Sequence, residues 1–317
     1  MKDVIELRKF WQIHVSEPLL LCTLIRKSGS SYRALGAKKI LSLSTGHSSG
    51  TLSGGCLEGD INRVALEGAD RLPFTHRFST LSDDDRLLGY QTGCSGVIEI
   101  LFEKLPPHTE QKDLYFPFGS SESASGVEVD LRPGQIGLRK FVDTPFETND
   151  EFFFDNWLTS VAVTIIGCGT DADPYFHFAD LLGWNIQFID YRSNLTKPDR
   201  FGNTEAQLVS IPNISKKIPD GKKSAVILMT HNYEADLQIF ETLVGKDIGY
   251  LGCLGPRRRY ELLKHDLQRL YNKTVPEDWE NKIINSPPGV ISRNYSPNEI
   301  AFSVIAEIQQ KLGVDLA

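Results

Sequence analysis

Two short loops combine glycine, serine and cysteine next to predicted secondary structure. Ser53-Gly54-Gly55-Cys56-Leu57-Glu58 runs into a predicted helix over residues 57–66, and Gly93-Cys94-Ser95-Gly96 precedes a predicted strand over residues 97–102. Backbone N–H groups at a helix start bind anions and favour a thiolate. We therefore predict an anion site at Ser53–Cys56 and a reactive thiol at Cys56, opposed by the charge of Glu58. The alternative, that Cys56 and Cys94 are small buried residues in tight turns, stays open.

A third loop has the pattern of a dinucleotide-binding turn. The apolar residues 161–166 lead into a Gly-x-Gly-x-x-Ala motif that begins with Gly167 and Gly169, and Asp190 lies 18 residues beyond it. In such a turn the backbone approaches a pyrophosphate and the distant acid holds a ribose hydroxyl. However, Asp171 and Asp173 stand where carboxylates complement the helix dipole and repel phosphate. NAD(P) binding is therefore possible but disfavoured, and the alternative is that the glycines serve strand–helix packing alone.

Further polar groups follow the predicted strands of the same region. Arg192, Thr230 and His231 come directly after strands, and Arg257 opens a run of three arginines at a helix start. Ligands bind at the carboxyl ends of parallel strands, so we expect these groups to meet there. His231 is a candidate proton donor, with a structural hydrogen-bonded role as the alternative. The arginines are candidates for holding an anion, with a solvated basic face as the alternative.

The elements that must position these groups form an α/β protein. An N-terminal α/β, loop-rich domain is predicted for residues 1–105, with a helix ended by Pro18 and apolar strands at 19–25 and 40–43. Residues 106–155 are rich in Pro, Gly and Ser and are interpreted as a bridging segment. From residue 156 to 317, strands alternate with helices, which predicts a Rossmann-like, doubly wound parallel sheet. Gly183 is expected to cap one of these helices and Pro297 to open the last one.

Composition narrows the class of protein. The chain has 317 residues, 40% of them hydrophobic and 24% charged, which excludes a disordered or fibrous protein and predicts two domains. The net charge of -7 argues against nucleic acid as the main partner. The five cysteines are odd in number and form no CxxC pair, and no apolar run could span a membrane. We therefore expect a cytoplasmic protein with reduced thiols, in which Cys22 belongs to the core.

Taken together, the motifs resemble the XdhC/CoxI family, the accessory proteins of molybdenum hydroxylases such as xanthine dehydrogenase. The motifs occur in the same order as in the family and are spread over nearly the whole chain. The sequence departs from the family pattern where the family usually has glycine and this chain has Ser95, and where Leu-Asp-Ile-Gly is replaced by Val290-Ile-Ser-Arg293. The matching segments are Gly29–Arg33 with Gly36-Ala37, Ser53–Glu58, Gly93-Cys94, Ile166–Gly169, Leu182–Ile186, Asp190–Arg192, Thr230–Asn232, Leu251–Gly255 with Arg257–Arg259, Ser286–Gly289 and Pro297–Ala301.

The resemblance implies a maturation factor rather than an enzyme. Such a factor binds the molybdenum cofactor (molybdopterin), protects it during sulfuration by a cysteine desulfurase, and helps to insert it into an apo molybdenum hydroxylase. A homodimer is the default assembly. The implied metal ligands are Cys56 and Cys94. The implied cofactor-binding residues are Ser53, Gly54, Gly55, Cys56, Glu58, Cys94, Gly167, Gly169, Asp190, Arg192, Thr230, His231 and Arg257.

Two other hypotheses stay open. One is an NAD(P)-dependent oxidoreductase that uses the Gly167/Asp190 turn. The other is an interaction scaffold without a small ligand.

Overall fold

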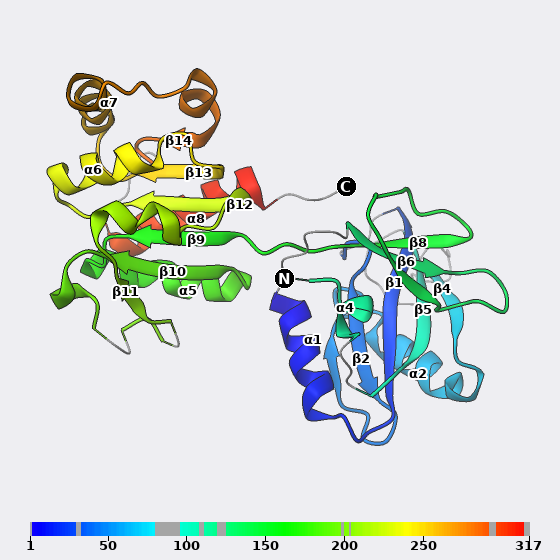
Figure 1. Ribbon diagram of the computed structural model, residues 1–317. Helices are drawn as coiled ribbons and strands as arrows, with labels where there is room; N and C mark the ends of the chain where they lie inside the picture. Colours follow the sequence, from blue (N-terminus) through cyan, green and yellow to red (C-terminus); the bar gives the residue numbers. More distant parts are fainter. Residues whose placement is uncertain are drawn as a thin grey trace. The chain divides into compact units, whose positions relative to one another are not determined.

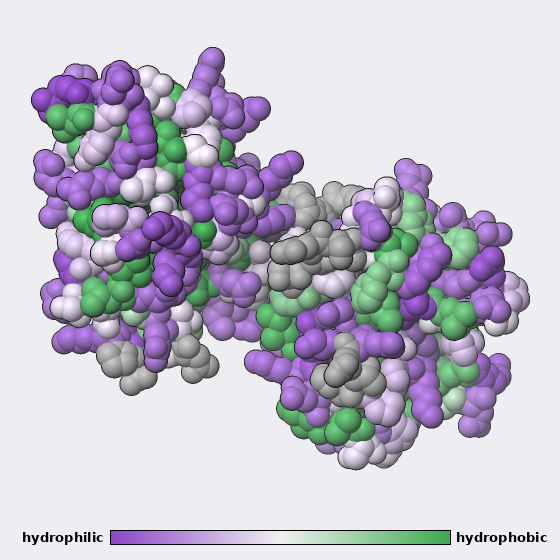
Figure 2. All heavy atoms as spheres, viewed as in Figure 1, coloured by the Kyte–Doolittle hydropathy of each residue, from purple (hydrophilic) through white to green (hydrophobic). Residues whose placement is uncertain are grey.

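The computed structural model describes residues 2–29, 33–79, 96–107, 111–118, 125–197, 200–202, 204–291 and 296–313. They divide into two units, one covering Asp3–Thr159 and the other beginning at Ser160. Polar residues cover most of the visible face of each unit (Figure 2). Each unit encloses its own apolar clusters, so each has a separate core.

The second unit is built on a parallel sheet of six strands in the order β11-β10-β9-β12-β13-β14 (Figure 1). The chain forms β9 first and adds β10 and β11 on one side, then β12, β13 and β14 on the other. This is the doubly wound arrangement of a Rossmann fold, and the strand order reverses between β9 and β12. The strands are β9 (Ala162–Ile166), β10 (Asn185–Asp190), β11 (Ala206–Leu208), β12 (Gly221–Leu228), β13 (Ile248–Cys253) and β14 (Ile284–Asn285).

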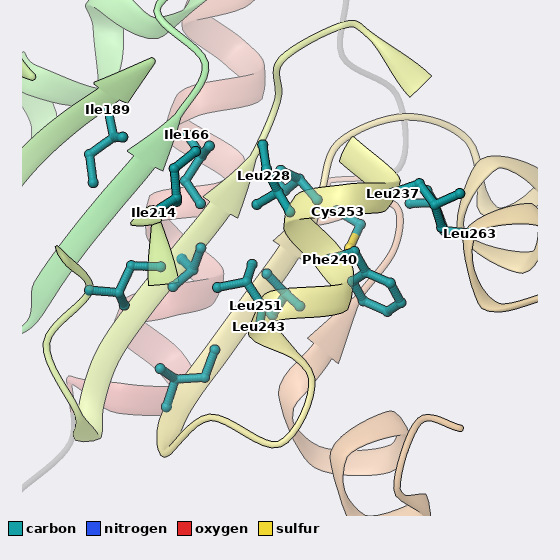
Figure 3. Packing of buried hydrophobic residues seen from close by; sticks show 14 of the residues in the cluster. Ile166, Ile189, Ile214, Leu228, Leu237, Phe240, Leu243, Leu251, Cys253 and Leu263 are labelled. Carbon is teal, nitrogen blue, oxygen red and sulfur yellow. The ribbon is translucent and has the colours of Figure 1, made fainter. Parts of the chain in front are cut away.

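Helices cover both faces of this sheet, as predicted. α5 (Asp173–Leu182) packs against α8 (Pro297–Leu312), whereas α6 (Tyr233–Leu243) packs against α7 (Arg257–Tyr271). Figure 3 shows Leu251 of β13 next to Leu243 of α6, and Leu263 of α7 next to Leu237 of α6. Ile166 and Leu228 belong to the same apolar cluster. Each such side chain contributes roughly 1.5–3 kcal/mol when it leaves water.

The ends of the helices follow the predicted signals. Gly183 ends α5 in the left-handed conformation, with φ 70. Ser296 and Glu299 form a reciprocal capping box before Pro297, which opens α8.

The first unit contains an antiparallel sheet of five strands in the order β3-β2-β1-β5-β4. Alternation along β1 explains its two buried faces. Leu20, Cys22 and Leu24 pack with α2, while Leu19 and Leu21 pack with α1. The core position predicted for Cys22 is confirmed. The elements are α1 (Lys2–Ile13), β1 (Leu19–Gly29), β2 (Lys38–Ser42), β3 (Ser48–Gly50), α2 (Glu58–Glu67), β4 (Phe74–Ser79), β5 (Gly96–Leu105) and α4 (Lys112–Tyr115).

Residues 106–155 are not a bridge between domains, and that prediction was wrong. They belong to the first unit, where a second sheet forms in the order β7-β6-β8 from β6 (Gly126–Asp130), β7 (Arg139–Val142) and β8 (Phe152–Asn156). Val127, Val129 and Phe153 pack on Ile25 and Leu101 of the larger sheet. Among the residues that suggested a linker, Pro106 follows the end of β5 and Gly126 begins β6. The alternating apolar residues of the strands determine which face is packed.

Buried charges join the two sheets of the first unit. Lys38 on β2 contacts Asp155 on β8 at 2.6 Å, and Arg139 on β7 contacts Glu103 on β5 at 2.6 Å. All four side chains are at most 5% exposed. Burial lowers the pKa of Lys38, and the neighbouring carboxylate of Asp155 opposes this shift. Because each buried charge has an opposite partner, removing any one would leave an uncompensated charge in the core.

At the point where the strand order reverses, two turns meet without space for a side chain. Gly167 directly follows β9 and has φ 114, and a Cβ there would overlap the carbonyl of Met229 and lie 2.8 Å from Thr230 Cα. Gly221, at the start of β12, has the same φ of 114 but open space around it.

Gly221→Ala is expected to lower the free energy of unfolding by about 1–3 kcal/mol through backbone strain alone. Gly167→Ala should add a further loss of about 1–3 kcal/mol, because the β12 turn must also move. Urea denaturation of both variants measures the difference. Equal losses would contradict the close approach of the two turns.

Candidate functional site

The acid of the dinucleotide motif is already occupied by the protein. The Asp190 side chain is fully buried and accepts hydrogen bonds from Cys168 N at 2.7 Å and from Arg192 Nε and Nη2, both at 2.9 Å. Burial alone would raise the pKa of Asp190, but Arg192 and the backbone N–H groups hold it below the usual value. Both oxygens are engaged, so the expectation that Asp190 holds a ribose hydroxyl does not fit the geometry.

The start of α5 is likewise filled by side chains. Arg200 contacts Asp173 at 2.9 Å and donates to the carbonyls of Cys168 and Gly169. His231 Nε2 lies 2.7 Å from Asp171 Oδ2. Carboxylates therefore stand where a pyrophosphate would approach the helix, and each already has a basic partner.

A small pocket of about 250 Å³ lies beside this turn, at the carboxyl ends of β12 and β13. One wall carries Arg259, whose Nη2 lies 2.7 Å from Asp236 Oδ2. Asp236 is 2% exposed and also accepts from Thr230 Oγ1 at 2.5 Å, so the guanidinium is held in place. The residues that line the pocket are Met229, His231, Asp236, Leu254, Gly255, Pro256 and Arg259.

The structure selects a different arginine from the one predicted. Arg257 is exposed and pairs with Glu261 at 2.8 Å, whereas Arg259 lines the pocket. Side chains two positions apart on a helix point in directions that differ by about 200°. Arg257 and Arg259 therefore cannot both face the same pocket. His231 lines the pocket as expected, and Thr230 lies behind it as a partner of Asp236.

Sequence reasoning missed Asp236, and it named Arg259 only as one of a run of three candidate arginines. A signal existed for Asp236, because it occupies the apolar face of α6 at helical spacing from Phe240 and Leu243, all three buried. A charge on a buried face requires a partner. The local sequence does not indicate which of the three arginines pairs with Asp236.

In the first unit, Glu58 organises the glycine and cysteine loop. Its Oε1 accepts from Leu52 N at 2.8 Å, Ser53 N at 2.9 Å and Ser53 Oγ at 3.1 Å, and its Oε2 contacts Lys39 Nζ at 2.6 Å. Burial would raise the pKa of Glu58, but Lys39 and the two backbone N–H groups hold it below its ordinary value. Glu58 is therefore an anchor of the loop.

This anchoring changes two expectations about the loop. Ser53 Oγ accepts from the N–H groups of Gly55 and Leu57, both at 3.2 Å, so several donors of the predicted anion site are used internally. Gly54 and Cys56 are exposed, and the alternative of a buried Cys56 is wrong. Cys94 and Ser95 lie outside the described residues.

The described part of the chain also lacks two features. No group of three His, Cys, Asp or Glu side chains suited to a metal ion occurs there. None of the helices found there combines the length and the apolar character needed to cross a membrane.

Comparison with known proteins identifies both units. Residues 13–79 match the model of the XdhC and CoxI family, and residues 163–308 match that of the XdhC Rossmann domain. The chain belongs to the XdhC/CoxI family. Together the two matched regions cover about two thirds of it.

Individual relatives agree with this membership. The chain is 24% identical over 325 residues to a probable xanthine dehydrogenase subunit from Bacillus subtilis (strain 168), covering 93% of each chain. It is 30% identical over 151 residues to the uncharacterized protein YqeB of Escherichia coli (strain K12), but spans only 27% of that protein. A crystal structure of a xanthine dehydrogenase from Bacillus halodurans superimposes with a TM-score of 0.80 and 26% identity, covering 99% of this chain and 96% of that one.

Glu58→Gln is expected to lower the free energy of unfolding by about 1–3 kcal/mol at pH 7, since the amide leaves Lys39 without its charged acceptor and can serve fewer donors. Glu58 has a lowered pKa in the folded state, so its contribution is present above about pH 4.3 and is lost as pH falls through the folded pKa.

The matched control is Glu67→Gln on the same helix, where Glu67 is 61% exposed and pairs with Arg63. Urea denaturation at pH 7 and pH 3 should show a difference from wild type only for Glu58→Gln, and a smaller one at pH 3. A loss that does not depend on pH would contradict the role of the carboxylate.

Proposed function

We propose that this chain is an accessory factor that binds the molybdenum cofactor, assists its sulfuration and helps to insert it into an apo molybdenum hydroxylase. Family membership supports this proposal because it associates the chain with xanthine dehydrogenase. In this role a cysteine desulfurase supplies the sulfur, and two copies of the chain form the working assembly. The chain itself binds and presents the cofactor rather than catalysing a redox reaction.

The pocket lined by His231 and Arg259 is the observation that carries the proposal. Its donors suit the terminal phosphate of a pterin cofactor: a guanidinium fixed by Asp236, an imidazole, and the backbone N–H groups at the start of the 15-residue helix α7. At about 250 Å³ it is smaller than a typical pocket for a whole ligand of that size, which suits one end of such a ligand.

The residues have distinct roles in this proposal. Arg259 binds the phosphate and Asp236 orients Arg259. Asp171 and Asp173 keep the phosphate away from α5. When bound, the cofactor would supply molybdenum. The exposed thiol of Cys56 in the first unit is a separate candidate for a soft ligand to such a metal.

The competing function, an NAD(P)-dependent oxidoreductase, draws on the turn at Gly167. Asp190, the acid that would bind the ribose, is hydrogen-bonded to Cys168 and Arg192. The position expected for the phosphate faces the carboxylate of Asp171. The geometry therefore favours the cofactor-binding role.

Arg259→Gln is expected to reduce the molybdenum and pterin content of protein purified from cells that make the cofactor by about tenfold, because a charged hydrogen bond to the phosphate is lost. Arg257→Gln, two residues away and exposed, should retain the wild-type content. Metal analysis and pterin fluorescence give the measurement, with circular dichroism to show that both variants fold. Equal content in the two variants would refute the assignment of the pocket.

Cys56→Ala tests the metal contact in the first unit. We expect weaker retention of molybdenum during gel filtration with unchanged thermal stability, because the thiol is exposed and its loss removes no packing. Cys94→Ala is the companion variant. Unchanged retention in both proteins would rule out a thiolate ligand from these loops.

A further inference from the structure

Each of four aspartates at the carboxyl edge of the parallel sheet has a basic partner. Three of these partners are arginines: Arg192 for Asp190, Arg200 for Asp173 and Arg259 for Asp236. The fourth aspartate, Asp171, is paired with His231 at 2.7 Å. An arginine keeps its charge at all ordinary pH values, whereas a histidine changes its charge between about pH 5 and 8.

The charge beside the pocket therefore depends on one group. The Arg259–Asp236 and Arg200–Asp173 pairs are each neutral at any physiological pH. When the imidazole of His231 is neutral, the negative charge of Asp171 beside it is not cancelled by its partner, and this charge opposes an anion. When the imidazole is protonated, that charge is cancelled, and the partial positive charge at the start of α7 acts unopposed.

The geometry holds the imidazole in the position this role requires. His231 lies three residues beyond the end of β12 and has φ 57, a left-handed conformation that is uncommon outside glycine. A Cβ on Gly169 would lie 3.7 Å from His231 Cδ2, so the ring edge lies beside the glycine turn. Nε2 faces Asp171, which leaves Nδ1 as the ring nitrogen without a bonded partner among the described residues. The side chain is 58% exposed and lines the pocket, so protons and ligands can reach it.

We infer that an anionic group binds this pocket together with a proton on His231, with Asp171 as the residue that makes binding depend on that proton. The ligand class is a phosphomonoester or another oxyanion that fits beside Arg259. This inference rests on the proposed function for the identity of the natural ligand, the phosphate end of the cofactor. It adds that retention is proton-linked: loss of the proton restores the negative charge of Asp171 and favours release.

Sulfate alone is the suitable probe, because its own charge is constant above about pH 3, so any pH dependence comes from the protein. Calorimetric titration at one pH in two buffers of different ionisation enthalpy measures the protons taken up on binding. The wild-type protein should take up a substantial fraction of one proton per site near neutral pH. In the limit where only the imidazolium binds, affinity falls by about tenfold for each pH unit above the point of half-protonation.

The two members of the pair should respond in opposite directions. His231→Asn should bind sulfate weakly at every pH and take up no proton. Asp171→Asn should bind more tightly than wild type at pH 8, with smaller proton uptake, because the uncancelled charge is gone. A merely structural contact would instead weaken binding in both variants.

His265 provides the matched control, since its Nδ1 also lies beside an aspartate, Asp266 at 3.1 Å, but on the outer part of α7 and outside this pocket. His265→Asn should retain both sulfate affinity and proton uptake. The inference is overturned if wild-type protein binds no sulfate, if its binding takes up no proton, or if Asp171→Asn weakens binding. Proton-linked sulfate binding together with unchanged cofactor content in Arg259→Gln would instead refute the proposed function and leave the oxyanion site standing.

Discussion

The close approach of two turns at Gly167 is the constraint on which the candidate site depends. Gly167 closes β9 against the carbonyl of Met229 at the end of β12, where the order of the sheet reverses. Any side chain at this position would push the turns apart. Because the two turns touch, Asp171 from one turn contacts His231 from the other. His231 in turn forms part of the lining of the pocket beside β13. A contact between backbones thus determines which side chains meet.

The second unit shows how a Rossmann fold can retain its glycine turn while its nucleotide-binding groups are used for other contacts. The N–H of Cys168 and both oxygens of Asp190 are joined within the protein, and Arg200 covers the carbonyls of the turn. The anion-binding character shifts to the start of α7, where Arg259 is fixed by Asp236. Fold and motif therefore did not determine the ligand, which depends on the pairing of individual side chains.

In the glycine and cysteine loop of the first unit, contacts within the protein likewise occupy the groups of the motif. The carboxylate of Glu58 accepts hydrogen bonds from the backbone N–H groups of Leu52 and Ser53 and from the ammonium of Lys39. These bonds fix the conformation of the loop. That anchoring leaves Gly54 and Cys56 exposed on a fixed support. Buried pairs between Lys38 and Asp155, and between Arg139 and Glu103, hold the second sheet against the first. The thiol of Cys56 is thus exposed on a loop that other residues hold in place.

The sequence by itself determined most elements of the second unit, though not the short edge strands β11 and β14. It also determined the doubly wound sheet, the cap at Gly183, the start of α8 and the burial of Cys22. These features depend on local periodicity and on backbone preferences that each segment carries alone. Sequence motifs also identified the family, which the comparisons confirmed.

Only the tertiary structure decided which groups pair. It turned residues 126–156 into a packed sheet, gave Arg259 rather than Arg257 to the pocket, and made Asp190 and Glu58 internal anchors. Ion pairs such as Arg259–Asp236 and Asp171–His231 join residues 23 and 60 positions apart. Their formation depends on helix phase and on how turns meet across the sheet, and neither is written in the spacing of a single segment.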